Sequence, residues 1–95
     1  MISVTKVLSS ANVEAVQQGK VVFVRCDFPA QSNTGWVRVA TGLPLTSFQA
    51  IARGVGAGGG AVNSWMAVNG TELEVLVQPN EINIQMAFTL TYIAS

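Results

Sequence analysis

The pattern of apolar and polar side chains near the C-terminus repeats every two residues. Apolar side chains stand at alternate positions: Ile82, Ile84, Met86, Phe88, Leu90 and Tyr92. Successive side chains of an extended chain point to opposite faces, so this spacing places all of them on one face, whereas a helix scatters them. The pattern predicts a long strand over 82–92 with one buried face.

Two earlier segments, 61–68 and 72–78, alternate in the same way. Pro79-Asn80 provides turn chemistry between the second of them and the C-terminal strand, which predicts a hairpin there. Asn69-Gly70 is the favoured dipeptide of a type I′ turn, because both residues tolerate positive φ. Together these signals predict a C-terminal meander of three antiparallel strands.

The first half of the chain shows the same period less regularly. A strand over 20–28 places Val22, Val24, Cys26 and Phe28 on one face. Its other face begins apolar with Val21 and Phe23 and ends charged, so we expect one end of it to be covered. Shorter strands are predicted over 36–40 and 47–53. The segment 13–16 fits either a strand or a helical turn, and the β-rich run that follows favours the strand.

These elements define a fold class. Turn signals recur every eight to twelve residues in a chain rich in Thr, Val and Ile, and no segment has a helical period. This pattern is typical of a small all-β domain. We therefore predict a single domain over 1–95, an antiparallel β-sandwich of jelly-roll-like form.

Charge is the unusual part of the composition. Charged residues make up 11% of the 95, five Lys or Arg and five Asp or Glu, against a usual share of about 25%. Zero net charge removes self-repulsion and favours association with copies of the same chain, and it leaves no basic surface for nucleic acid. The start of the chain does not read as a leader, and no apolar run reaches about 18 residues, so we expect a mature, soluble chain without membrane insertion.

The sequence also argues against catalysis. The chain has no His, which excludes Ser-His-Asp and Cys-His nucleophiles and His-bound zinc. Its single cysteine, Cys26, is expected to be a small buried hydrophobe. Glu72 and Glu74, with Glu81 across the predicted hairpin, are expected on a solvated face that protects a sheet edge, not as a shielded acid–base pair. We expect no catalytic residue, no metal and no cofactor.

The glycine-rich segment 54–60 contains a formal G-x-G-x-x-G at Gly54, Gly56 and Gly59. That motif binds a dinucleotide by opening a helix, whereas the residues after Gly60 alternate as in a strand. We therefore interpret the segment as a connection between strands. Whether it also closes on a ligand or on a neighbouring chain stays open at this point.

The large aromatic residues provide the candidate binding site. Tyr92 follows the apolar face of its strand and is expected in the core. Trp36 has Arg38 on its face, and Trp65 has Asn63. Aromatic rings beside Arg and Asn suit a sugar or a protein surface, because the ring stacks on an apolar face while the polar groups fix orientation. Each Trp is therefore either a ligand platform or an interface anchor.

Three segments resemble a known group of proteins. They are Gly35-Trp36-Val37-Arg38-Val39-Ala40-Thr41-Gly42-Leu43-Pro44, the run from Ser64-Trp65 to Asn69-Gly70, and Phe88-Thr89-Leu90-Thr91-Tyr92-Ile93. They look like small β-domains at the ends of bacteriophage or prophage tail-fibre and baseplate proteins. The resemblance implies a homotrimer in the virion or phage tail, made in the bacterial cytoplasm, that adheres to a bacterial surface component, often a saccharide. It carries over no binding residue.

Three functions follow as hypotheses. The first is a non-enzymatic, self-associating tail-fibre or baseplate tip domain that contacts a host receptor. The second is a stand-alone carbohydrate-binding module that uses Trp36 and Arg38. The third is an architectural virion subunit without an external ligand.

Overall fold

The computed structural model describes residues 2–46, 49–56 and 59–95, and these form a small antiparallel all-β fold, which confirms the predicted fold class. The elements are β1 (Thr5–Lys6), β2 (Asn12–Gln18), β3 (Val21–Phe28), β4 (Gly35–Thr41), β5 (Ala50–Gly56), β6 (Ala61–Asn69), β7 (Glu72–Val77), the 3₁₀ turn η1 (Pro79–Glu81) and β8 (Met86–Ile93).

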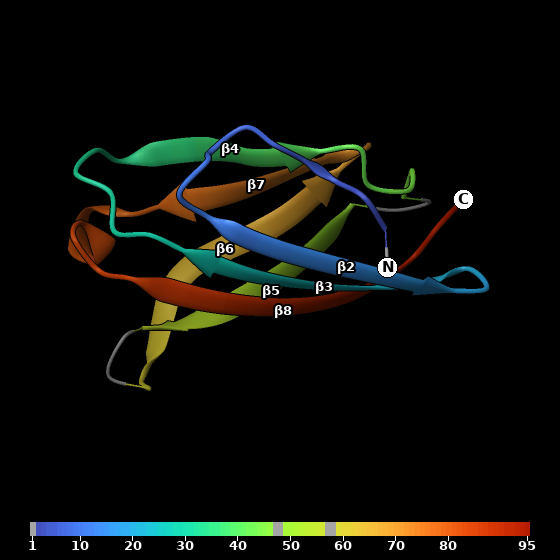
Figure 1. Ribbon diagram of the computed structural model, residues 1–95. Coiled ribbons are helices and arrows are strands. Elements are labelled where there is room, and N and C mark those ends of the chain that lie inside the picture. Colours follow the sequence, from blue (N-terminus) through green and yellow to red (C-terminus); the bar gives the residue numbers. More distant parts are fainter. Residues whose placement is uncertain (1, 47–48, 57–58) are drawn as a thin grey trace.

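All the strands belong to one sheet, in the order β1-β4-β7-β6-β5-β8-β3-β2, and every neighbouring pair is antiparallel. The sheet coils around its core until it is nearly closed. Figure 1 shows β4 and β7 on the opposite side of the molecule from β2, β3 and β8, with β5 and β6 passing between the two sides. The two layers of the predicted sandwich are therefore parts of one continuous sheet.

The N-terminal segment bridges the gap between the two ends of this sheet. The amide of Ile2 donates to the carbonyl of Ala15 on β2 at 2.8 Å. A few residues later β1 pairs with β4, and the amide of Val7 donates to the carbonyl of Val39 at 2.9 Å. Unpaired strand edges attract other chains, so this bridge protects part of each edge.

The core consists of the inward-facing residues of the alternating strands. All eight residues of β3 pair with β8, from Val21 opposite Ile93 to Phe28 opposite Met86. This register buries the predicted face of each strand: Val22, Val24, Cys26 and Phe28 from β3, and Phe88, Leu90 and Tyr92 from β8. Tyr92 lies in the core as expected. Its hydroxyl donates to the carbonyl of Pro44 at 2.6 Å, and burial raises its pKa.

The predicted strand over 82–92 is wrong at its start. The chain leaves β7 through η1, and Asn83 has a φ of 64°, a left-handed value that an extended strand does not contain. The strand therefore begins only at Met86. Ile82 and Ile84 still pack against the core, half-buried, which explains why they follow the apolar pattern without belonging to the strand.

The predicted hairpin between β7 and β8 is also wrong, and with it the third strand of the predicted meander. β7 pairs with β4 and β6, whereas β8 pairs with β3 and β5. Alternation tells which side chains share a face but not which strand lies beside it. Here η1 carries the chain across to the other side of the molecule instead of reversing it in place.

The hairpin of β6 and β7 is confirmed, with its turn shifted by one residue. Asn69 pairs with Glu72, so the turn residues are Gly70 and Thr71. Gly70 has a φ of 65°, whereas Thr71 is not in the left-handed region. Positive φ at the first central residue alone fits a type II′ turn better than the expected type I′ turn.

Both uncertain strands of the first half exist. The segment 13–16 lies within β2, so the preferred interpretation is confirmed. The strand predicted over 47–53 is β5, which the structure places at Ala50–Gly56, while residues 47 and 48 lie outside the described residues. Gly54 and Gly56 thus belong to a strand, and β6 follows as a strand and not as the helix a dinucleotide motif needs.

Cys26 is fully buried, as expected of a small hydrophobe. Burial, and to a lesser extent the negative charge of Asp27, raises the pKa of its thiol from 9.0 to about 12. In the unfolded chain the thiol ionises near its ordinary pKa, while in the folded chain it stays protonated to a much higher pH.

This shift predicts alkaline destabilisation. The stability that the buried, protonated thiol of Cys26 contributes is fully present below about pH 9. As the pH rises from there towards 12, the free energy of unfolding falls by up to about 1.4 kcal/mol per pH unit. Urea unfolding at about pH 8 and about pH 10 measures it. The Cys26→Ala variant should have a lower free energy of unfolding than the parent at both pH values, but that free energy should fall less between pH 8 and pH 10. An equal fall in the two proteins would contradict the raised pKa of Cys26.

Candidate ligand-binding site

The outer face of β4, β7, β6 and β5 gathers the residues that point away from the core. Strand register sets their order across the sheet. Trp36 on β4 is opposite Leu76 on β7, and Trp65 on β6 is opposite Arg53 on β5. In the next row, Ala67 lies between Glu74 on β7 and Ile51 on β5. Residues that are distant in sequence thus become neighbours on one surface.

An apolar hollow opens on this face between the two tryptophans. Trp36, Ile51 and Trp65 line a space of about 180 Å³. Trp36 and Ile51 are both 51% exposed, so large apolar side chains are left in water there. Contiguous exposed apolar surface is typical of binding sites, so this hollow is a candidate for one.

A more polar hollow of about 250 Å³ adjoins the first and shares Trp36 with it. Gln49, Asn69 and Glu74 contribute its polar groups, and Ala67 lies among them. Ala67 is only 2% exposed although it alternates with outward-facing residues, because the longer side chains around it cover its methyl group. We call the two hollows together the Ala67 groove, defined by Trp36, Gln49, Ile51, Trp65, Ala67, Asn69 and Glu74.

Two arginines lie on the same outer face as this groove. The guanidinium of Arg53 lies over the ring of Trp65, 4.6 Å from its centre, which is cation–π geometry. Arg38 forms an ion pair with Glu72, and both side chains are well exposed. Exposed pairs of this kind contribute at most about 1 kcal/mol to stability.

The structure brings together two of the predicted site residues and leaves Arg38 outside their hollow. Trp36 and Trp65 share one hollow, which the sequence did not foresee. Arg38 lies on the same outer face as Trp36, but its partner is Glu72 and it does not line the groove. Asn63 belongs to β6, and the expectation for its side chain falls outside the part of the chain that the structure describes.

The other groove residues were missed by the sequence analysis. Asn69 was assigned to a turn, and Glu74 to a solvated, edge-protecting face. β7 is an interior strand between β4 and β6, so its carboxylates protect no edge. Glu81 does not lie across from them either, because it is buried in η1. The useful signal was Ala67, a small residue in an outward position between larger ones.

Within the described residues, no three His, Cys, Asp or Glu side chains gather closely enough to hold a metal ion. In the same part of the chain, no helix has the length and apolar character needed to span a bilayer.

Comparison of the chain with protein-family models, with curated proteins and with solved structures finds no match. The resemblance to tail-fibre and baseplate domains therefore stays a prediction from the sequence.

Proposed function

We propose that this chain is a non-enzymatic receptor-binding domain of the tail-fibre or baseplate kind, which associates with copies of itself and binds a bacterial surface saccharide in the Ala67 groove. The observation that carries the proposal is the convergence of exposed Trp36 with Trp65 and Ile51 beside the polar groups of Gln49, Asn69 and Glu74. A homotrimer is the assembly that the resemblance implies.

The chemistry of the groove suits a sugar. A pyranose ring has an apolar face of C–H groups and a rim of hydroxyls. The indoles and Ile51 offer a matching apolar surface, and ligand sites combine such surfaces with a few placed polar groups. A carboxylate accepts hydrogen bonds from hydroxyls, and the amides of Gln49 and Asn69 both donate and accept.

The support for a non-enzymatic role lies in the side chains present. The chain contains no His, and among the described residues Glu74 is the only carboxylate that lines the groove. Hydrolysis of a glycosidic bond generally uses a pair of carboxylates on the two sides of that bond. We therefore assign the groove to binding without turnover.

The decisive variant is Trp36→Ala. We expect it to weaken binding to bacterial surface polysaccharides on a glycan array at least about tenfold, because the indole borders both hollows and its loss removes stacking area. Thermal unfolding should change little, since Trp36 is half exposed. Leu45→Ala is the matched control, an exposed apolar residue that lines neither hollow. Absence of glycan binding by the parent chain, or equal binding by parent and variant, would refute the proposal.

A stand-alone carbohydrate-binding module is the second candidate. The observation that favours it is that β4, β5, β6 and β7 bring the apolar and polar residues of the Ala67 groove together on one face of the sheet. Light scattering separates the two functions. A monomer at high concentration that still binds glycans through Trp36 supports the module, whereas an assembly supports the self-associating tip domain. An assembly that binds no bacterial surface component supports a purely architectural subunit.

A further inference from the structure

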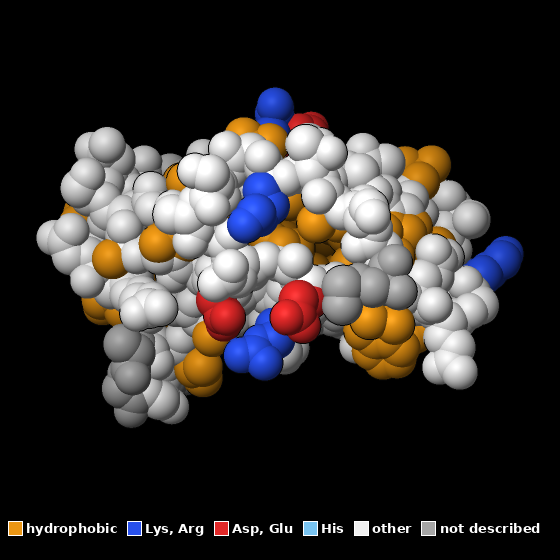
Figure 2. Space-filling view, viewed as in Figure 1, with side chains coloured by type: hydrophobic (Ala, Val, Ile, Leu, Met, Phe, Trp, Pro, Cys, Tyr) orange, Lys and Arg blue, Asp and Glu red, His pale blue; other side chains and the backbone are white. Residues whose placement is uncertain are grey.

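A second outer face, formed by β2, β3 and β8, also leaves large apolar side chains in water. Val16, Phe23 and Ile93 are 46%, 47% and 49% exposed. The register places Val16 beside Phe23, and Val21 beside Ile93 on the next row. This confirms that the outer face of β3 is apolar at its start, whereas no part of the described chain covers it as the sequence analysis expected. Figure 2 shows hydrophobic side chains beside a group of acidic and basic ones on the side of the molecule that includes β2.

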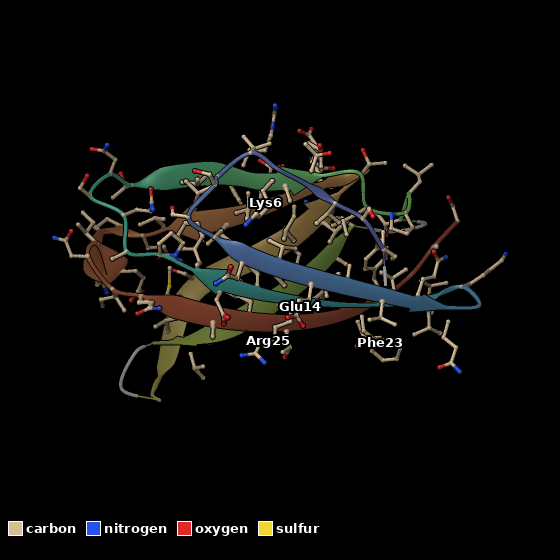
Figure 3. The ribbon with its side chains drawn as sticks, in the orientation of Figure 1. Lys6, Glu14, Phe23 and Arg25 are labelled. Carbon is tan, nitrogen blue, oxygen red and sulfur yellow. The ribbon has the colours of Figure 1, made fainter. Side chains whose placement is uncertain are left out.

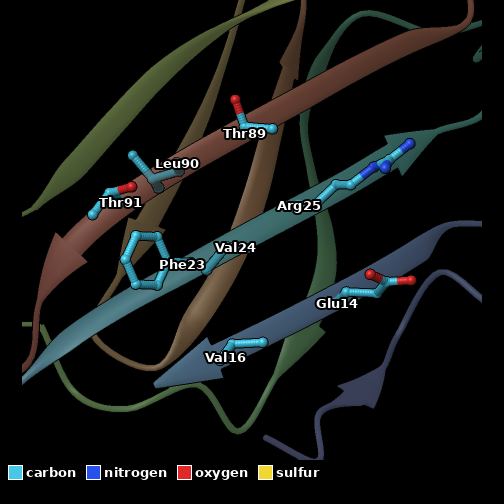
Figure 4. A pocket seen from close by; sticks show the side chains of 8 residues that line it. All are labelled: Glu14, Val16, Phe23, Val24, Arg25, Thr89, Leu90 and Thr91. Carbon is cyan, nitrogen blue, oxygen red and sulfur yellow. The ribbon is translucent and has the colours of Figure 1, made fainter. Parts of the chain in front are cut away.

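This face also contains a hollow of about 290 Å³. It lies between Glu14 and Val16 on β2, Phe23 and Arg25 on β3, and Thr89 and Thr91 on β8 (Figure 4). Its volume is just below the range of roughly 300–1,000 Å³ that is usual for sites of drug-sized ligands. An apolar side chain from another protein surface is a more suitable occupant. The projecting ring of Phe23 is such a side chain, and it stands at the hollow's own border.

The charges on this face are arranged in the same self-complementary way. Glu14 and Arg25 are register partners on adjacent strands, and both point outward (Figure 3). Glu14 forms no ion pair among the described residues, and Arg25 reaches only Asp27, at 3.7 Å with both side chains well exposed. The face therefore presents Glu14, an acid that is open to a partner, beside Arg25, a base whose pair with Asp27 is long and exposed.

An interface between identical copies about a twofold axis requires that one patch contain both halves of every contact. This face meets that requirement in two ways. The projecting ring of Phe23 lies beside a hollow, and the acidic Glu14 lies beside the basic Arg25. β2 is the last strand of the sheet, so the face continues to a sheet edge without another strand beyond it. The absence of net charge adds no repulsion between copies.

We propose that the outer face of β2, β3 and β8 joins two copies of this chain about a twofold axis, with Phe23 of each copy packed into the hollow of the other and Glu14 of each paired with Arg25 of the other. The inference deepens the self-association in the proposed function and rests on it. It replaces the threefold assembly implied by the resemblance with a twofold one.

The first test is oligomeric mass in a dilution series, measured by light scattering and sedimentation. The parent chain should form a dimer, and Phe23→Glu should be a monomer at concentrations where the parent is paired. Trp36→Ala is the control on the other face and should leave the dimer intact. A monomeric or trimeric parent, or a dimer that survives Phe23→Glu, would overturn the proposal.

The second test separates pairing between copies from pairing within one copy. Glu14→Arg and Arg25→Glu should each weaken the homodimer at least about tenfold, because like charges then meet across the axis. Mixing the two variants should restore a dimer, since each new charge finds its opposite on the other copy. Mixing the variants restores opposite charges only between copies, because each single chain still carries two like charges. A mixture that stays monomeric would therefore overturn the proposed contact.

These outcomes are independent of glycan binding. A monomer that still binds saccharide through Trp36 refutes the twofold face and leaves the groove assignment standing. A dimer that Phe23→Glu dissociates but that binds no saccharide supports the twofold face and refutes the saccharide part of the proposed function.

Discussion

Phe88→Ala should lower the free energy of unfolding by about 3–5 kcal/mol, the usual cost of removing a buried aromatic side chain. Phe88 is 1% exposed and lies on β8 between Cys26 on β3 and Gly54 on β5. Its truncation removes a large apolar area from the core and leaves a cavity. The cavity cannot easily collapse, because β8 is hydrogen-bonded to β3 on one side and to β5 on the other. Such a loss is a large share of the stability of a domain of this size.

Urea unfolding of parent and variant measures this effect. Glu74→Ala, on the outer face of β7, is the control and should change stability by no more than about 0.5 kcal/mol. If the truncation of Phe88 cost as little as this control, the assignment of the inner face of β8 would be wrong.

The features that the sequence predicts well are those that depend on local alternation. A period of two identifies most of the strands and the inner faces of β3 and β8. This period arises whenever one face of a strand is buried and the other is in water, whichever strands lie beside it. The buried states of Cys26 and Tyr92 follow from the same reasoning. Turn residues locate the β6–β7 hairpin, although the left-handed conformation is needed at Gly70 and not also at Asn69.

The features that the sequence misses depend on contacts between distant segments. Ile82 and Ile84 alternate like strand residues, but they pack against the core from a connection that contains η1 and a left-handed Asn83. The pairing of β7 with β4, and of β8 with β5, is set by how the whole sheet closes, which no local pattern encodes.

The candidate site illustrates the same limit. The sequence identified Trp36 and Trp65 as exposed aromatics, but it gave no reason to place them in one hollow. They meet because β7 pairs with β4 on one side and with β6 on the other. Glu74 joins them from β7, and Ile51 joins them through the pairing of β5 with β6. The small outward residue Ala67 hints at a hollow, but the strand order is needed to tell which residues surround it.

Gly54 is the residue whose role changes most between sequence and structure. In the sequence it begins a low-complexity segment, whereas in the structure it is a buried strand residue opposite Phe88. A Cβ atom at this position would lie 2.6 Å from the backbone oxygen of Ala87 and 2.6 Å from the ring of Phe88. The missing side chain therefore makes room for the ring.

Gly54→Ala should consequently destabilise the protein by about 3 kcal/mol or more, at the upper end of the cost of overpacking, because one of the clashing atoms is backbone and cannot rotate away. Gly60→Ala is the matched control in the same glycine-rich segment. An added Cβ there has no neighbour within 4 Å and the residue has no left-handed φ, so it should be neutral or slightly stabilising.

A double-mutant cycle with Phe88→Ala connects the two predictions. When the ring is absent, part of the space that the new methyl group needs is empty, so Gly54→Ala should cost less in that background than in the parent. The clash with the Ala87 oxygen persists, so the relief should be partial. Strict additivity in urea unfolding would mean that the ring does not lie on Gly54. The close approach of β5 to β8, on which the closure of the sheet depends, would then be wrong.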